Sequence, residues 1–209
     1  MHLFHRYWMG PLHMALSDRP FGPVSGASTI PGNPPLNTQA AQSGPLPRTL
    51  TLTSAAQTQV SSAELPGVPL FVEIPPATML EQTVFDLWIS GYIKTTAAGT
   101  ITVAVFEGNS ATIGNNTLLG TSGAVTQASA TAAWFAHAQL IYDSVSGTLA
   151  GTIEFYIDRT PVAKVTLSNF PTNIGNLNNP VASFTLTVAS SGATSGTPTT
   201  FNVQKFTVG

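Results

Sequence analysis

The 209-residue chain is weakly charged and contains no cysteine. Asp, Glu, Lys and Arg make up 8% of it, against roughly 25% in typical soluble proteins, and the formal net charge is −2. No run of Lys and Arg is present to neutralise phosphates, which excludes nucleic acid as a partner. The absence of cysteine excludes a disulfide framework and a zinc-thiolate site. No segment reaches the ~18–20 apolar residues of a membrane span.

The first 19 residues gather large apolar side chains, namely Phe4, Tyr7, Trp8, Met9, Leu12 and Met14. Burying one such side chain is worth roughly 1.5–3 kcal/mol, so we expect the cluster to leave water. Aromatic and methionine anchors are typical of interface cores, which predicts that these six residues bind a partner. The alternative is that the segment folds back onto its own domain. The scattered histidines His2, His5 and His13 are interpreted as contact residues and not as a metal site.

Proline dominates the next part of the chain. Residues 20–47 hold seven of the sixteen prolines, together with four glycines. Such a composition excludes a helix or a central strand and favours an extended, polyproline-like segment. We therefore predict an extended arm over residues 1–47 and a folded domain over residues 48–209.

From Thr49 onward, apolar and polar residues alternate with a period of two, which is typical of half-buried strands. The clearest segments are 49–53, 85–93, 101–105, 134–142, 153–157, 162–167, 182–188 and 201–208. Turn-rich segments at 108–116, 169–180 and 190–200 separate them. We predict about ten strands, no helix and an all-β fold, an antiparallel β-sandwich. Its predicted core contains Trp134, Leu140, Tyr142, Ile153, Phe155, Ile157, Phe184 and Leu186.

The run Phe135–Leu167 resembles the second half of laminin-G and concanavalin-like jelly rolls. In that family a strand ending in aromatic-Asp, here Tyr142-Asp143, turns through a Ser/Gly loop. A strand of apolar and aromatic residues that ends in Asp follows, here Ile153–Asp158, and then a tight turn. The family has glycine after this aspartate, whereas this chain has Arg159. The resemblance implies a jelly roll.

Asp143 and Asp158 are the candidate calcium ligands that the resemblance implies. Laminin-G-like domains often bind Ca²⁺ at the rim of the sandwich through carboxylate and carbonyl oxygens. Both residues lie at predicted strand ends, where such oxygens can converge. Aspartate is also a standard turn former, because its side chain accepts hydrogen bonds from the nearby backbone. We interpret both as turn residues and expect no metal and no cofactor.

Catalytic groups are sparse. His137 is the one histidine in the predicted folded part, and the G-x-S-x-G motif of a nucleophilic serine is missing. His137 shares the less apolar face of its strand with Gln139, so we interpret it as a surface or partly packed histidine. Glycoside hydrolysis needs a pair of carboxylates, but they are scattered: Glu73, Glu81, Asp86, Glu107, Asp143, Glu154 and Asp158. We expect no enzymatic activity.

The arm, the Thr/Ala/Gly-rich strands and the lack of cysteine resemble the head decoration proteins of tailed bacteriophages. The resemblance implies a structural virion protein, a capsid cement subunit that binds the major capsid protein and neighbouring subunits as a homo-oligomer, with a trimer favoured. The interrupted apolar start lacks the core of a signal peptide, which fits a location on the capsid surface of a virion.

The alternative function is that of a carbohydrate-binding β-sandwich from a viral fibre or a secreted protein. Trp88 and Tyr92 lie on the more polar face of a predicted strand, where an aromatic ring can stack on a sugar. Packing between the two sheets explains these aromatic residues equally well.

Overall fold

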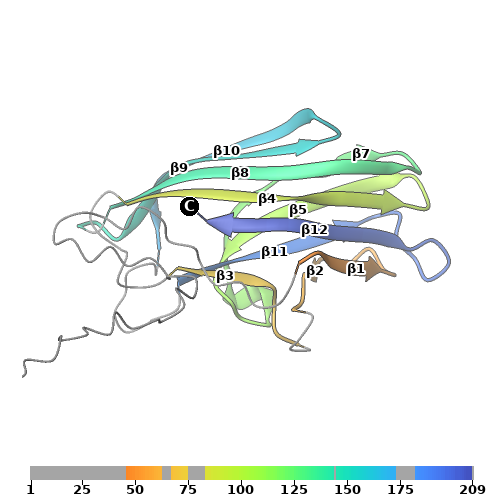
Figure 1. The fold of residues 1–209 in the computed structure, drawn as a ribbon, viewed down its shortest axis with the longest axis horizontal. Coiled ribbons are helices and arrows are strands. Elements are labelled where there is room, and N and C mark those ends of the chain that lie inside the picture. The colour runs from red at the N-terminus through yellow and green to blue at the C-terminus, as the bar shows by residue number, and fades with distance from the viewer. Residues whose placement is uncertain (1–45, 63–66, 75–82, 144, 173–181, 209) are drawn as a thin grey trace, which may run out of the picture.

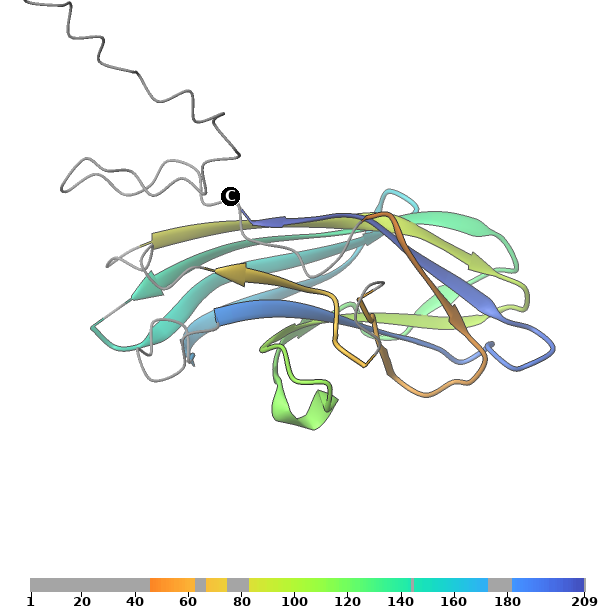
Figure 2. The same cartoon turned by 60° about the horizontal axis from the view of Figure 1, so that its bottom comes forward.

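The computed structural model describes residues 46–62, 67–74, 83–143, 145–172 and 182–208. They form two antiparallel sheets packed face to face, which Figure 2 shows as two layers. The described residues contain no α-helix and one short 3-10 turn, η2 (Ile113–Asn115). The predicted all-β sandwich is therefore confirmed.

Both sheets have six strands. We call the one with the longer strands the larger sheet, and its strand order is β1-β12-β4-β8-β9-β10 (Figure 1). Their bounds are β1 Arg48–Leu52, β4 Thr83–Thr95, β8 Thr131–Asp143, β9 Thr148–Ile157, β10 Thr160–Pro171 and β12 Thr199–Val208. Long neighbours pair along most of their length: β4 pairs with β8 from Thr83 to Lys94. The five strands from β12 to β10 form the broad surface on which the candidate site lies.

The smaller sheet runs in the order β2-β11-β5-β6, with β3 also paired to β11 and β7 to β5. Its strands are β2 Thr58–Gln59, β3 Phe71–Ile74, β5 Gly99–Glu107, β6 Thr117–Thr121, β7 Val125–Gln127 and β11 Ala182–Ser190. The chain crosses between the two sheets several times, for example from β3 to β4 and from β10 to β11. This winding is that of a jelly-roll-like sandwich.

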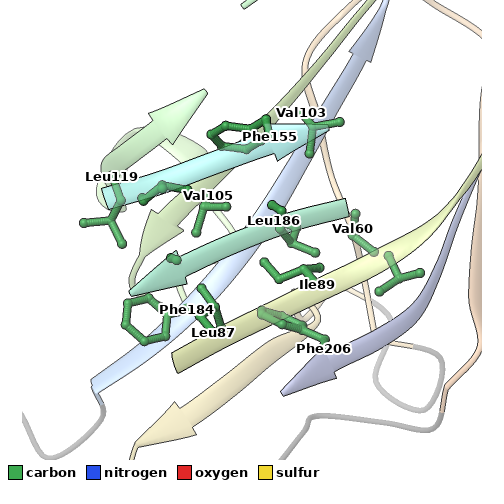
Figure 3. Packing of buried hydrophobic residues seen from close by; sticks show 14 of the residues in the cluster. Val60, Leu87, Ile89, Val103, Val105, Leu119, Phe155, Phe184, Leu186 and Phe206 are labelled. Atoms are coloured by element: carbon green, nitrogen blue, oxygen red, sulfur yellow. The ribbon is translucent and has the colours of Figure 1, made fainter. Parts of the chain in front are cut away.

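The core lies between the sheets. Figure 3 shows side chains of both layers meeting there, with Leu87 and Ile89 of β4 near Phe184 and Leu186 of β11. All eight core residues predicted from the alternation are buried: Trp134, Leu140, Tyr142, Ile153, Phe155, Ile157, Phe184 and Leu186. Burying so many large apolar side chains is the main term that stabilises the fold.

Gly91 lies in the middle of β4 because no side chain fits there. A Cβ at this position would overlap the backbone oxygen of Asn202 and would lie 3.0 Å from the indole nitrogen of Trp134. That nitrogen donates a hydrogen bond to the same Asn202 oxygen at 3.1 Å. The buried indole nitrogen of Trp134 thus finds its hydrogen-bond acceptor only because Gly91 lets β12 approach closely.

The β9–β10 hairpin positions the candidate site. Its loop has two residues, Asp158 and Arg159, both with positive φ (51° and 65°), as a type I′ turn requires. Pro161 lies inside β10, which begins at Thr160. Between Pro161 and Ala163 the register with β9 shifts by one residue, which leaves Val162 as a bulge.

Candidate functional site

The outer face of the larger sheet carries two rows of side chains that cross the strands. The outer face is the side of the larger sheet that points away from the smaller sheet. In one row the register places Trp88, His137, Glu154 and Lys164 side by side on β4, β8, β9 and β10. In the next row it places Ser90, Phe135, Tyr156 and Pro161 side by side on the same strands. On β8 and β9 the residues of both rows point outward, because their neighbours along each strand are buried in the core.

Glu154 accepts two hydrogen bonds at the β10 end of these rows. The Nζ of Lys164 donates to its Oε1 at 2.7 Å, and the hydroxyl of Tyr156 donates to its Oε2 at 3.0 Å. The bond from Lys164 first, and then the bond from Tyr156, lower the pKa of Glu154. The same carboxylate raises the pKa of Lys164. Both partners therefore stay charged at neutral pH, and their charges cancel.

An open hollow of about 300 Å³ lies over β9 and β10 at this point. Its lining residues are Glu154, Tyr156, Pro161, Val162, Ala163 and Lys164. Pockets for small ligands begin at about this volume and combine apolar walls with a few polar groups. The bulge contributes Val162 to the wall, as bulges commonly redirect side chains beside binding sites.

Tyr156 is the aromatic residue among those that line the hollow. Phe135, on the neighbouring strand β8, stacks on the ring with centroids 4.2 Å apart and planes at 11°. The other residues that line the hollow belong to β9 and β10, so the hollow lies on the side away from Phe135. Phe135 thus fixes the ring from the β8 side, and Pro161, its register partner on β10, lies on the other side.

A second cluster lies next to the hollow, centred on Trp88. We call it the indole cluster: Asp86, Trp88, His137 and Lys205. The His137 ring stacks on Trp88 with centroids 4.0 Å apart, and its Nε2 lies 2.5 Å from Oδ1 of Asp86. Lys205, on β12 at the other side of β4, places its Nζ 5.5 Å from the centroid of the Trp88 ring. All four side chains are therefore held by their neighbours.

Trp88 and Tyr92 lie on the outer face and not between the sheets. The interpretation that they serve packing between the sheets is therefore wrong, because the alternate residues Leu87 and Ile89 fill that role. Trp88 keeps 39% of its surface exposed. His137 is a partly packed surface residue, and no serine hydroxyl is bonded to it within the described ranges.

Asp143 is a turn residue, as predicted. Its Oδ1 accepts a hydrogen bond from the backbone nitrogen of Val145 at 2.9 Å, and its Oδ2 accepts one from the hydroxyl of Ser146 at 2.6 Å. The Ser146 bond first, and then the Val145 bond, lower the pKa of Asp143. The carboxylate thus closes the loop between β8 and β9.

Asp143 and Asp158 cannot share a calcium ion, because they lie at opposite ends of the ten-residue strand β9. At about 3.3 Å per residue that strand separates them by about 30 Å. No group of three or more His, Asp or Glu side chains suited to a metal occurs among the residues placed in the structure.

The six N-terminal residues predicted to bind a partner, Phe4, Tyr7, Trp8, Met9, Leu12 and Met14, lie outside the described residues. So does the arm up to residue 45. In the part of the chain that is described, no helix has the length and apolar character needed to cross a membrane.

Comparisons with known proteins found a distant structural similarity. No protein-family model and no curated protein matches the chain. Among solved structures, a legume lectin-like domain from Entamoeba histolytica is similar over 78% of this chain and 88% of its own, with 10% identity and a TM-score of 0.29. A likeness that distant carries no argument about what this chain binds.

Proposed function

We propose that this β-sandwich is a carbohydrate-binding module and that the hollow over β9 and β10 holds one sugar ring. The observation that carries the proposal is a hollow lined by an aromatic ring, Tyr156, which Phe135 fixes, and by the Glu154–Lys164 pair. An aromatic face packs against the apolar C–H groups of a sugar, and charged side chains hydrogen-bond strongly to its hydroxyls.

The charge of the hollow favours a neutral ligand. Glu154 and Lys164 are the two charged residues that line it, and they already neutralise each other. A ligand with its own charge has to compete with that pair, whereas a hydroxyl can accept from Lys164 and donate to Glu154 while the pair stays intact. We therefore expect a neutral hexose or N-acetylhexosamine rather than an acidic sugar.

The expected affinity for one sugar ring is low. About a dozen non-hydrogen atoms at roughly 0.3 kcal/mol each give about −4 kcal/mol, which corresponds to a Kd of about 1 mM. Saturation-transfer NMR detects binding in this range. The probes are glucose, galactose, mannose and N-acetylglucosamine, each at several millimolar.

We predict transfer to at least one of the four sugars and its loss in the Tyr156→Ala variant. Tyr92→Ala is the matched control, because it removes another outer-face tyrosine that does not line the hollow, and it should bind like the unmodified chain. Near-identical melting curves would show that both variants fold. Transfer to none of the four sugars, or equal losses in the two variants, would contradict the proposal.

The capsid role predicted from the sequence is a separate proposal, since it rests on the arm and its six apolar anchors. Deleting residues 1–19 tests it: we expect nearly unchanged melting of the isolated protein and lost occupancy on the particle. A large drop in melting temperature with intact occupancy would show that the segment completes its own domain.

A further inference from the structure

The hollow lies at one end of a longer row of polar and aromatic side chains on the outer face. From Lys164 the row passes through Glu154 and His137 to Trp88, and Thr207 of β12 is the next register partner. Neighbouring strands lie about 4.8 Å apart, so the four steps from β10 to β12 cover about 19 Å. That length exceeds one sugar ring and fits several linked rings.

The indole cluster forms the far end of this row and offers both donors and acceptors. Because Trp88 and His137 stack across neighbouring strands, their ring planes stand upright on the sheet and present edges outward. Ring edges carry partial positive charge and attract hydroxyl oxygens. The exposed ammonium of Lys205 donates, and the carboxylate of Asp86, 44% exposed, accepts.

The cluster is pre-organised. Free surface side chains lose rotamer freedom when they bind a ligand, which weakens binding. Here Asp86 is bonded to His137, and His137 and Lys205 hold Trp88 from its two sides, since β8 and β12 flank β4. A ligand that reaches these groups finds them already in place.

Aliphatic side chains border the row on one side and indicate that polar contacts run across the strands. Toward the end of the sheet where β8 turns into β9, the outer face becomes aliphatic: Val84 and Ile141 are register partners with 51% and 45% of their surfaces exposed. Polar ligand contacts therefore continue across the strands from the hollow to the indole cluster.

We infer that the ligand is a linear, neutral oligosaccharide that crosses the strands, with one ring in the hollow and a later ring against the indole cluster. The inference rests on the proposed function of the hollow and extends it to a second contact. Trp88 and Lys205 then act on chain length, because a single ring in the hollow does not reach them.

The test compares each sugar with its own tetramer by calorimetry on the full 209-residue chain. The probes are cellotetraose and laminaritetraose against glucose, galactotetraose against galactose, mannotetraose against mannose, and chitotetraose against N-acetylglucosamine. We expect one tetramer to bind at least tenfold more tightly than its monomer. Trp88→Ala and, separately, Lys205→Ala should remove most of that gain and leave monomer binding unchanged. Tyr92→Ala should change neither.

The outcomes separate the two proposals. Monomer binding without a gain for any tetramer overturns the extended site and leaves the hollow standing. A tetramer gain that survives in both variants also overturns it, because the extra rings then bind elsewhere. Binding of neither monomers nor tetramers overturns the hollow and the extension together.

Discussion

Arg159 adopts a backbone conformation that favours glycine, with φ at +65° in the two-residue loop between β9 and β10. Jelly rolls of the laminin-G type, which the sequence resembles, have glycine at this position. A non-glycine residue there carries roughly 1–2 kcal/mol of strain, while glycine costs roughly 0.5–1 kcal/mol in extra unfolded-state entropy. We predict that Arg159→Gly stabilises the fold by about 0.5–1 kcal/mol.

For a chain of this size that gain raises the melting temperature by about 1–4 °C, which calorimetry resolves. Thr160→Gly is the control, because Thr160 is the first residue of β10 and gains nothing from a positive φ. It should lower the melting temperature. A decrease for Arg159→Gly would mean that the arginine side chain makes a contact worth more than the strain.

At the scale of the secondary-structure element, β10 combines a regular hairpin with a bulge. Thr160 and Pro161 pair with Ile157 and Tyr156 in one register, and Ala163 and Lys164 pair in a register shifted by one. Deleting Val162 joins the two registers without changing any existing pair. We predict that the deletion leaves the melting temperature within a few degrees and weakens binding at the hollow at least tenfold, because a wall is lost.

Val162→Ala keeps the bulge and trims the wall, so it should weaken binding less than the deletion does. The melting temperature and the sugar titration of both variants check this. If the deletion prevents folding, the bulge is needed by the core, and the Val162→Ala variant alone tests the wall. Equal sugar binding in the deletion and the unmodified chain would remove Val162 from the site.

The same bulge explains why the sequence predicts the strands but not the site. Alternation along one strand shows which residues face the core, and it placed Phe155 and Trp134 correctly. Extending the register from the hairpin loop alone puts Ala163 opposite Glu154, whereas the bulge brings Lys164 there. The short strands β2 and β7 carry too few residues for alternation to be visible. The stacking of Phe135 on Tyr156 depends on β8 and β9 being neighbours in the sheet. The alternation of residues within one strand does not predict which strands pair.

At the scale of the whole molecule, the sparse charge favours self-association, which remains a prediction. Only 8% of residues are charged, so the surface desolvates at low cost, and closed symmetric oligomers are the usual outcome. We propose a trimer. A trimer matches the local symmetry axes of an icosahedral capsid, which is the setting that the resemblance to phage decoration proteins implies. Sedimentation velocity at micromolar concentration should give the mass of three 21.8 kDa chains. A monomer, both with and without residues 1–19, would contradict this proposal.

The position of β12 has a consequence for synthesis on the ribosome. This last strand lies inside the larger sheet, between β1 and β4, so that Arg48 pairs with Val203. At about 5–20 residues per second, translation from the start of β4 at Thr83 to the end of β12 at Val208 takes about 6–25 s, and through that time the sheet lacks an inner strand. The nascent chain therefore exposes the unpaired edge of β4, where other chains can attach. The larger sheet closes only once β12 has left the ribosome, and a codon change that slows translation between β4 and β12 prolongs the aggregation-prone stage.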